Sequence, residues 1–219
     1  MKILIIQQKR IGDVLTSTIL SNNLKKKYPD AQIDYMCYAN CVDVLKNNTN
    51  IDNIIVLEEV VRKNYLSLFK FIFKLRKSNY DAIIDVYSKL ETNLITFFSG
   101  AKYRISYKKW YSTIFYNYNI ERQTTQKDNN IGLAIINRIE LLKPLIEENI
   151  TDYKPKIFLT SEEIKQAQDY IATFDLNKSQ PNFMIGILGS EWYKTYPFEK
   201  MAELLDYTVE NTNANLFFN

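Results

Sequence analysis

Residues 2–13, KILIIQQKRIGD, decide the fold class of this chain. The four consecutive apolar residues at positions 3–6 are typical of a strand buried on both faces, as found in parallel sheets. A polar loop follows, and Gly12-Asp13 opens an amphipathic segment that stops at Pro29. This pattern predicts a helix over residues 12–28. A strand, a loop and a helix in this order form the first half of a βαβ unit.

The same alternation continues along the next 130 or so residues. We predict further strands over residues 33–38, 53–57, 82–86 and 102–106, and helices over residues 42–46, 64–78, 90–98 and 131–147. Residues 117–130 are polar and aperiodic, which predicts a loop. Strands that alternate with helices at this spacing indicate an α/β fold with a Rossmann-like parallel sheet flanked by helices.

A second and shorter series follows a connector at residues 149–155. Thr160 and Glu163 have the spacing of a capping box that opens a helix to about residue 174. We predict strands over residues 156–159, 183–188 and 214–218, with the strand at 183–188 buried, and a helix whose first turn holds Pro197. Two strands and one helix do not enclose a core of their own. The expected domains are therefore residues 1–155 and the incomplete beginning of a second domain at residues 156–219.

Composition excludes several classes of protein. The 219 residues are 46% hydrophobic and 24% charged, as in a soluble globular protein, and the net charge of +3 is too small for a dedicated nucleic-acid binder. Histidine is absent, which excludes Ser-His-Asp and Cys-His catalysis and His-ligated metal sites. Two cysteines and the lack of a signal or membrane-spanning segment predict a cytoplasmic protein. The small net charge predicts that it binds no nucleic acid.

The loop after the first strand is the first candidate site. Ligands of open α/β sheets bind beyond the carboxyl ends of the strands. Asp13 lies at a helix N-terminus, where the dipole favours an ionised carboxylate that can act as a general base. Lys9 and Arg10 can hold an anion, and Gly12 lets the backbone approach a ligand. The alternative is that Asp13 caps the helix and both cations are only solvated.

A second candidate site lies between the strand predicted at residues 183–188 and the helix after it. Backbone N–H groups near Gly189, the Ser190 hydroxyl and the Lys194 ammonium suit a phosphate group. The alternative is an ordinary loop with no ligand.

Two basic segments offer further binding surfaces. Residues 102–127 hold six basic residues against the single acid Glu121, with aromatic residues interleaved, and can bind an anionic sugar, nucleic acid or a membrane. Residues 62–78 are basic and without acids, as in helices that lie on anionic membranes. For residues 102–127, the alternative is aromatic packing with solvated lysines. For residues 62–78, it is a helix that only covers the sheet.

Three blocks of sequence, in order, carry a resemblance to a known family. They are residues 2–36, KILIIQQKRIGDVLTSTILSNNLKKKYPDAQIDYM, residues 79–107, NYDAIIDVYSKLETNLITFFSGAKYRISY, and residues 187–205, ILGSEWYKTYPFEKMAELL. Together they resemble glycosyltransferase family 9, the ADP-heptose:lipopolysaccharide heptosyltransferases.

This resemblance implies a GT-B architecture of two Rossmann-like domains, of which the N-terminal one (residues 1–155) binds the acceptor and the C-terminal one, beginning at residue 156, binds the nucleotide-sugar. It implies an inverting, metal-independent transfer without a cofactor, from ADP-heptose to a lipid-linked anionic oligosaccharide at the inner face of the inner membrane, with peripheral membrane contact. Asp13 aligns with the catalytic carboxylate. Lys194, with Ser190 and Gly189, aligns with the donor-phosphate site. The expected acceptor-binding residues are Lys9, Arg10, Gly12, Tyr87, Ser88 and Arg104.

The chain departs from the family pattern at several positions. Tyr87-Ser88 stands where many members have Gln-Gly, Arg104-Ile105-Ser106 replaces Arg-Ile-Gly, and Tyr196-Pro197 replaces Trp-Pro. The family's later Asp-Thr-Gly-x-x-His motif, which helps to bind the donor, is absent. The alternative function is therefore a natively truncated, non-catalytic remnant that binds an acceptor or a protein partner.

Overall fold

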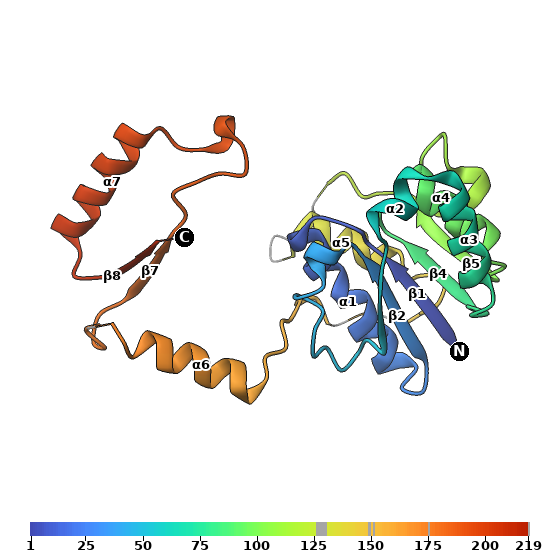
Figure 1. The fold of residues 1–219 in the computed structure, drawn as a ribbon, viewed down its shortest axis with the longest axis horizontal. Helices are drawn as coiled ribbons and strands as arrows, with labels where there is room; N and C mark the ends of the chain where they lie inside the picture. Colours follow the sequence, from blue (N-terminus) through green and yellow to red (C-terminus); the bar gives the residue numbers. More distant parts are fainter. Residues whose placement is uncertain (126–130, 149, 151, 175, 219) are drawn as a thin grey trace. The chain divides into compact units, whose positions relative to one another are not determined.

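One sheet of six parallel strands forms the centre of the first part of the chain (Figure 1). The computed structural model describes residues 1–125, 131–148, 150, 152–174 and 176–218. The strands are β1 (Lys2–Ile6), β2 (Gln32–Cys37), β3 (Asn53–Val56), β4 (Ala82–Asp85), β5 (Tyr103–Tyr107) and β6 (Tyr118–Ile120). Their order is β3-β2-β1-β4-β5-β6, and β1 is parallel to both β2 and β4. The direction of winding reverses between β1 and β4, which is where such sheets bind ligands.

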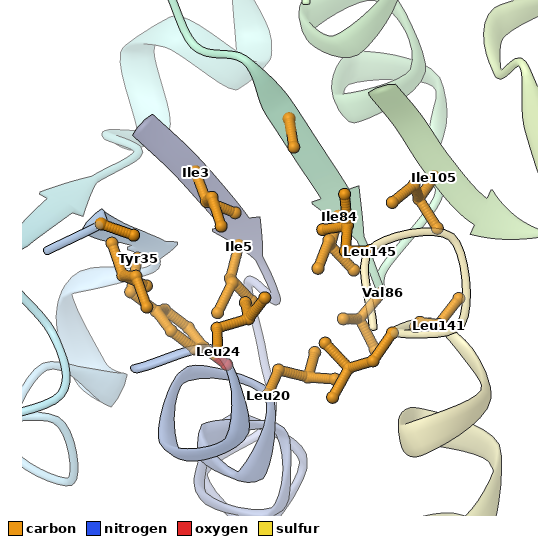
Figure 2. Packing of buried hydrophobic residues seen from close by; sticks show 14 of the residues in the cluster. Ile3, Ile5, Leu20, Leu24, Tyr35, Ile84, Val86, Ile105, Leu141 and Leu145 are labelled. Atoms are coloured by element: carbon orange, nitrogen blue, oxygen red, sulfur yellow. The ribbon is translucent and has the colours of Figure 1, made fainter. Parts of the chain in front are cut away.

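Helices cover both faces of this sheet, as predicted. Helix α1 (Ile11–Lys27) and the segment after α5 (Leu133–Glu140) pack on one face, and α3 (Tyr65–Arg76) and α4 (Leu90–Phe98) pack on the other, next to the short α2 (Glu59–Lys63). Successive residues of β1 face opposite sides, so Ile3 and Ile5 join the first core cluster while Leu4 and Ile6 join the second. Figure 2 shows Ile3 and Ile5 pointing toward Leu20 and Leu24 of α1.

Three local predictions in this part of the chain are wrong. Strand β6, which pairs with β5, lies inside the predicted loop of residues 117–130. The sequence did not predict it because three residues are too few to show a periodic pattern. The predicted helix at residues 42–46 is a series of turns after a 3₁₀ turn, η1 (Ala39–Cys41). The helix predicted over residues 131–147 ends at Glu140, because Pro144 has no N–H to donate to the Glu140 carbonyl and its ring would clash with that carbonyl. Residues 126–130, which include Lys127 of the basic tract, lie outside the described residues.

The chain divides into two compact units, Met1–Leu159 and Thr160–Asn219. The sequence places the boundary between residues 155 and 156. The second unit contains α6 (Ser161–Ile171), β7 (Asn182–Ile185), a 3₁₀ turn η3 (Trp192–Lys194), α7 (Phe198–Asn211) and β8 (Asn215–Phe218), with β7 and β8 parallel.

The capping box of the second unit is confirmed. The Thr160 Oγ1 accepts the Glu163 N–H at 3.1 Å, and the Glu163 carboxylate accepts the Thr160 N–H at 2.7 Å. Two strand predictions here are wrong. Residues 156–159 pair with no strand of the described chain. The strand predicted to be buried, β7, is largely exposed because its sheet has two strands and one neighbour cannot cover it. No helix in the described ranges combines the length and the apolarity that a membrane span requires.

Candidate active site

A cleft of about 340 Å³ opens at the carboxyl ends of β1, β4 and β5. Gln7 follows β1, Val86 and Tyr87 follow β4, and Tyr107 ends β5. The cleft is lined by these four residues together with Lys9, Asp13, Arg122, Ala134, Asn137 and Arg138. It therefore lies at the reversal of strand order, where the fold predicts a ligand site.

Asp13 presents its carboxylate at the edge of this cleft. It lies in the first turn of α1, whose N-cap is Arg10. Its side chain is 54% exposed, and its Oδ1 accepts a hydrogen bond from the Arg138 Nη2 at 2.8 Å. No described residue donates a hydrogen bond to Oδ2. One oxygen of the carboxylate is thus anchored, and the other can accept a proton.

Arg138 is the principal residue that the sequence analysis missed. It comes from α5, 125 residues away from Asp13, and its side chain is only 8% exposed. Its Nε donates to the Ser17 Oγ at 2.9 Å and its Nη1 to the Ala134 carbonyl at 3.0 Å. These bonds fix the plane of the guanidinium, so the direction from which it meets Asp13 is fixed as well. The available signal was its position three residues before the buried Leu141, on the inner side of an amphipathic helix.

The lining of the cleft is positively charged. It holds the cations Lys9, Arg122 and Arg138 against the single acid Asp13, which favours an anionic ligand. The Arg122 guanidinium lies 4.0 Å from the centroid of the Tyr107 ring. Burial raises the pKa of the Tyr107 phenol to about 12, so this ring stays neutral at physiological pH.

Helix α5 also positions the chain next to Arg122. The Asn137 side chain accepts the Gln123 N–H at 2.8 Å and donates to the Gln123 carbonyl at 3.2 Å. This pair of bonds ties the strand-like segment after β6 to the same helix that carries Arg138. Of the basic residues in the predicted tract 102–127 that the structure describes, Arg122 alone lines the cleft. Arg122 is therefore the described basic residue of this tract that can contact a ligand in the cleft.

The structure separates the predicted acceptor-binding residues into three groups. Lys9 and Tyr87 line the cleft, whereas Arg10 and Gly12 lie in the adjoining turn outside its lining. The other two predicted residues, Ser88 and Arg104, are elsewhere.

Ser88 and Arg104 do not reach the cleft. Ser88 is buried, with its Oγ 3.4 Å from the Asn93 Oδ1. Arg104 is the second residue of β5, so it lies near the amino end of the strand, at the opposite edge of the sheet. Its guanidinium donates to the carbonyls of Phe115 and Ala101 at 3.1 and 3.2 Å. Both predicted side chains are thus committed to contacts within the first unit.

Asp85 shapes the turn that carries Tyr87 to the cleft. Its Oδ1 accepts the N–H groups of Tyr87 and Ser88 at 3.0 and 2.7 Å, and Ser88 adopts a φ of +50°. Its Oδ2 accepts the Tyr116 hydroxyl at 2.6 Å. Burial raises the pKa of the Asp85 carboxyl, although these hydrogen bonds act in the opposite direction.

We expect Asp85→Asn to remove the contribution of Asp85 to the pH dependence of the free energy of unfolding. Because the pKa of Asp85 is higher in the folded protein, its contribution to the free energy of unfolding is largest below the unfolded pKa, near 4, and falls as the pH rises through the folded pKa. The asparagine variant should therefore gain stability relative to wild type between about pH 3 and about pH 7, by about 1.4 kcal/mol for each unit of pKa difference. Urea unfolding at both pH values measures this gain, with the exposed Asp30→Asn as the control. An equal difference at both pH values would contradict it.

The loop of the second unit brings its three predicted residues into one turn. The Gly189 N–H donates to the Thr195 Oγ1 at 3.1 Å, and a Cβ at Gly189 would lie 2.4 Å from the Lys194 carbonyl oxygen. Glycine is therefore required for the backbone to close here. Ser190 is exposed within this turn, and Lys194 ends η3, three residues before the N-cap Pro197 of α7. The exposed Ser190 hydroxyl and Lys194 ammonium at this place suit a phosphate.

Comparison with protein families identifies the relationship. The model of glycosyltransferase family 9 (heptosyltransferase) matches residues 68–218, which is more than half of the chain. The chain belongs to glycosyltransferase family 9. Lipopolysaccharide heptosyltransferase 1 of Campylobacter coli is 26% identical over 216 residues, which cover 96% of this chain and 61% of that protein. Lipopolysaccharide heptosyltransferase 3 of Escherichia coli K12 is 32% identical over 101 residues, 43% of this chain and 28% of that protein.

Solved structures of family 9 members share the fold. A glycosyl transferase family 9 protein from Veillonella parvula superposes with a TM-score of 0.77 at 21% identity, covering 99% of this chain and 61% of that one. The E. coli heptosyltransferase WaaC, solved with ADP-2-deoxy-2-fluoro heptose, gives a TM-score of 0.69 at 16% identity, covering 99% and 68%. The predicted GT-B-like α/β architecture is thereby confirmed. The chain spans about three-fifths of the length of the Campylobacter and Veillonella proteins.

Proposed function

We propose that this family 9 chain carries the acceptor site and part of the donor site of an inverting glycosyltransferase. The reaction is the transfer of heptose from ADP-heptose to the anionic inner core of lipopolysaccharide, without a metal ion or a cofactor. The observation that carries the proposal is the Asp13 carboxylate, which is half exposed at the edge of a basic cleft and held at one oxygen by the buried Arg138. The names of the matched relatives supply the sugar and the acceptor class.

In this mechanism Asp13 is the general base. The acceptor hydroxyl oxygen attacks the anomeric carbon of the heptose, and its proton passes to the Oδ2 of Asp13. The bond from the anomeric carbon to the diphosphate breaks, and its electron pair leaves on ADP. Attack from the face opposite the leaving group inverts the anomeric centre. Arg138 acts as a positioning residue, since it holds Oδ1 and thereby directs Oδ2.

The other cleft residues suit an anionic sugar. Lys9 and Arg122 can pair with carboxylate or phosphate groups, and the guanidinium of Arg122 can do so with two parallel hydrogen bonds. Tyr87 is half-buried in the lining, and the apolar face of a sugar ring can pack against its ring. The charges of Lys9 and Arg122 and the ring of Tyr87 thus together suit an anionic sugar as the acceptor.

The test is heptose transfer by the protein in the longest form that its gene encodes. Purified protein, radiolabelled ADP-heptose and heptose-deficient lipopolysaccharide should give labelled lipopolysaccharide with a chelator present. Absence of transfer together with retained acceptor binding would instead establish the alternative, a non-catalytic acceptor-binding protein. Absence of both would overturn the assignment of the cleft as an acceptor site.

We expect Lys194→Ala to lower the rate of transfer by about 10²–10³-fold, the usual cost of removing one group that stabilises developing charge. Lys194 is the cation of the glycine loop, and negative charge grows on the diphosphate as the glycosidic bond breaks. The exposed Lys200→Ala in α7 of the same unit is the matched control and should keep full activity. Steady-state kinetics at saturating acceptor measure the effect, and equal rates in the two variants would remove Lys194 from the site.

A further inference from the structure

We propose that the outer face of α3, α4 and the 3₁₀ turn η2 (Thr113–Phe115) docks on an anionic lipid bilayer. The proposal does not depend on the transfer reaction, because none of the residues that carry it lines the cleft. Helices α3 and α4 lie next to each other on the same side of the sheet (Figure 1).

Four phenylalanines form a continuous aromatic ridge across these elements. Phe69 of α3 meets Phe98 of α4 edge to face, with ring centroids 6.0 Å apart. Phe98 meets Phe97 at 5.2 Å, and Phe97 meets Phe115 of η2 at 5.7 Å. Phe69, Phe97 and Phe98 are each more than a third exposed. The rings therefore hold one another in place while they face solvent.

More exposed apolar side chains flank the ridge. Leu66 and Phe73 lie on α3 at three residues before and four after Phe69, so they share its outer side, and they are 75% and 62% exposed. Ile114 of η2, next to Phe115, is 75% exposed. The adjoining side of α3 is buried in the core through Leu68 and Ile72. Helix α3 is thus apolar on two sides, although only one side packs on the core. A contiguous exposed apolar surface of this kind marks an interaction site.

The charges around the ridge are of one sign. Residues 60–80 and 92–120 contain no aspartate or glutamate, and the one acid of α4 is Glu91 in its first turn. Lys70, Lys74 and Lys77 follow one another on the exposed surface of α3 and the residue after it. Lysines that border phenylalanines can place their stems on an apolar layer and their ammonium groups among anionic headgroups.

This combination favours a bilayer over a protein partner. The apolar side chains belong to three separate elements, α3, α4 and η2, and form one exposed surface across them. Aromatic and aliphatic tips bordered by lysines complement a layer that is apolar below and negatively charged at its surface. A second copy of the chain would bring the same lysines against one another, so charge opposes self-association through this face.

The experiment is sedimentation of the 219-residue chain with vesicles. The chain should bind vesicles of phosphatidylethanolamine with phosphatidylglycerol, bind vesicles of phosphatidylcholine far more weakly, and be released by high salt. Removing Lys70, Lys74 and Lys77 by alanine substitution should weaken binding about fivefold for each lysine. Leu66→Ser with Phe73→Ser should weaken it by on the order of tenfold or more.

Matched substitutions in the second unit serve as controls. Lys165→Ala with Lys200→Ala, and Val209→Ser, change exposed residues of the same kinds and should leave vesicle binding unchanged. Equal binding to both vesicle types, or equal losses in the ridge and control variants, would overturn the proposal. So would a dimer in the absence of lipid that Phe73→Ser dissociates, since the ridge would then bind a second copy. Because all of these residues are exposed, circular dichroism should show the same fold in every variant.

Discussion

Asp13→Asn will lower the rate of heptose transfer by about 10²–10⁴-fold while leaving the fold intact. The asparagine amide keeps an oxygen that can accept the hydrogen bond from Arg138, so the geometry of the cleft is preserved. It has no basic oxygen with which to take the proton of the acceptor hydroxyl. The loss should therefore fall on kcat, with the KM of the acceptor little changed.

The stability of this variant separates the chemical effect from a structural one. The asparagine oxygen can still accept the hydrogen bond from the buried Arg138, so loss of the ion pair should lower the free energy of unfolding by about 1 kcal/mol. Glu59→Gln is the matched control, because Glu59 is also a first-turn acid in an exposed ion pair, with Lys63 at 2.6 Å. Both variants should unfold close to wild type in urea. Full activity of Asp13→Asn would remove this residue as the base.

Arg138→Lys will lower kcat by on the order of 10–100-fold, because small displacements of a reacting group are costly. A lysine keeps the charge but has a single nitrogen, which cannot donate in the directions of Ser17, Ala134 and Asp13 at once. The Asp13 carboxylate then turns away from the position at which it meets the acceptor. The free energy of unfolding should fall by about 1–3 kcal/mol, since buried hydrogen bonds to a charged group are lost.

A double-mutant cycle distinguishes a positioning role from a general loss of stability. If Arg138 acts through Asp13, Arg138→Lys should cause no further loss of kcat in the Asp13→Asn background, whereas its effect on unfolding should persist. Arg122→Lys is the control at the same cleft and should raise the KM of the acceptor more than it lowers kcat. Multiplicative losses of kcat in the double variant would assign Arg138 a structural role alone.

Much of the fold was predictable because its signals are local. The uninterrupted apolar run of β1, the glycine and the proline that bound α1, and the capping box at Thr160 each depend on residues close together in the chain. The elements missed or misplaced are those whose state depends on distant partners. Strand β6 exists because β5 lies beside it, and β7 is exposed because its sheet holds one other strand.

The position of Arg104 away from the cleft could have been predicted from the sequence. A strand predicted over residues 102–106 places Arg104 in its first half, and ligands of parallel sheets gather at the other end. The burial of Ser88 offered no such signal. It follows from the hydrogen bond between its N–H and the Asp85 carboxylate, which turns its side chain toward Asn93.

The parallel α/β sheet, the family, and the position of Asp13 at a helix N-terminus beyond the first strand could all be predicted from the sequence. Periodicity and capping are properties of short segments, so one sequence was sufficient for them. The tertiary structure alone decided that Arg138 holds Asp13, that Asn137 ties the chain next to Arg122, and that the phenylalanines of α3, α4 and η2 form one ridge. Each of these contacts joins residues far apart in the chain, and which distant residues meet is set by how helices pack on the sheet.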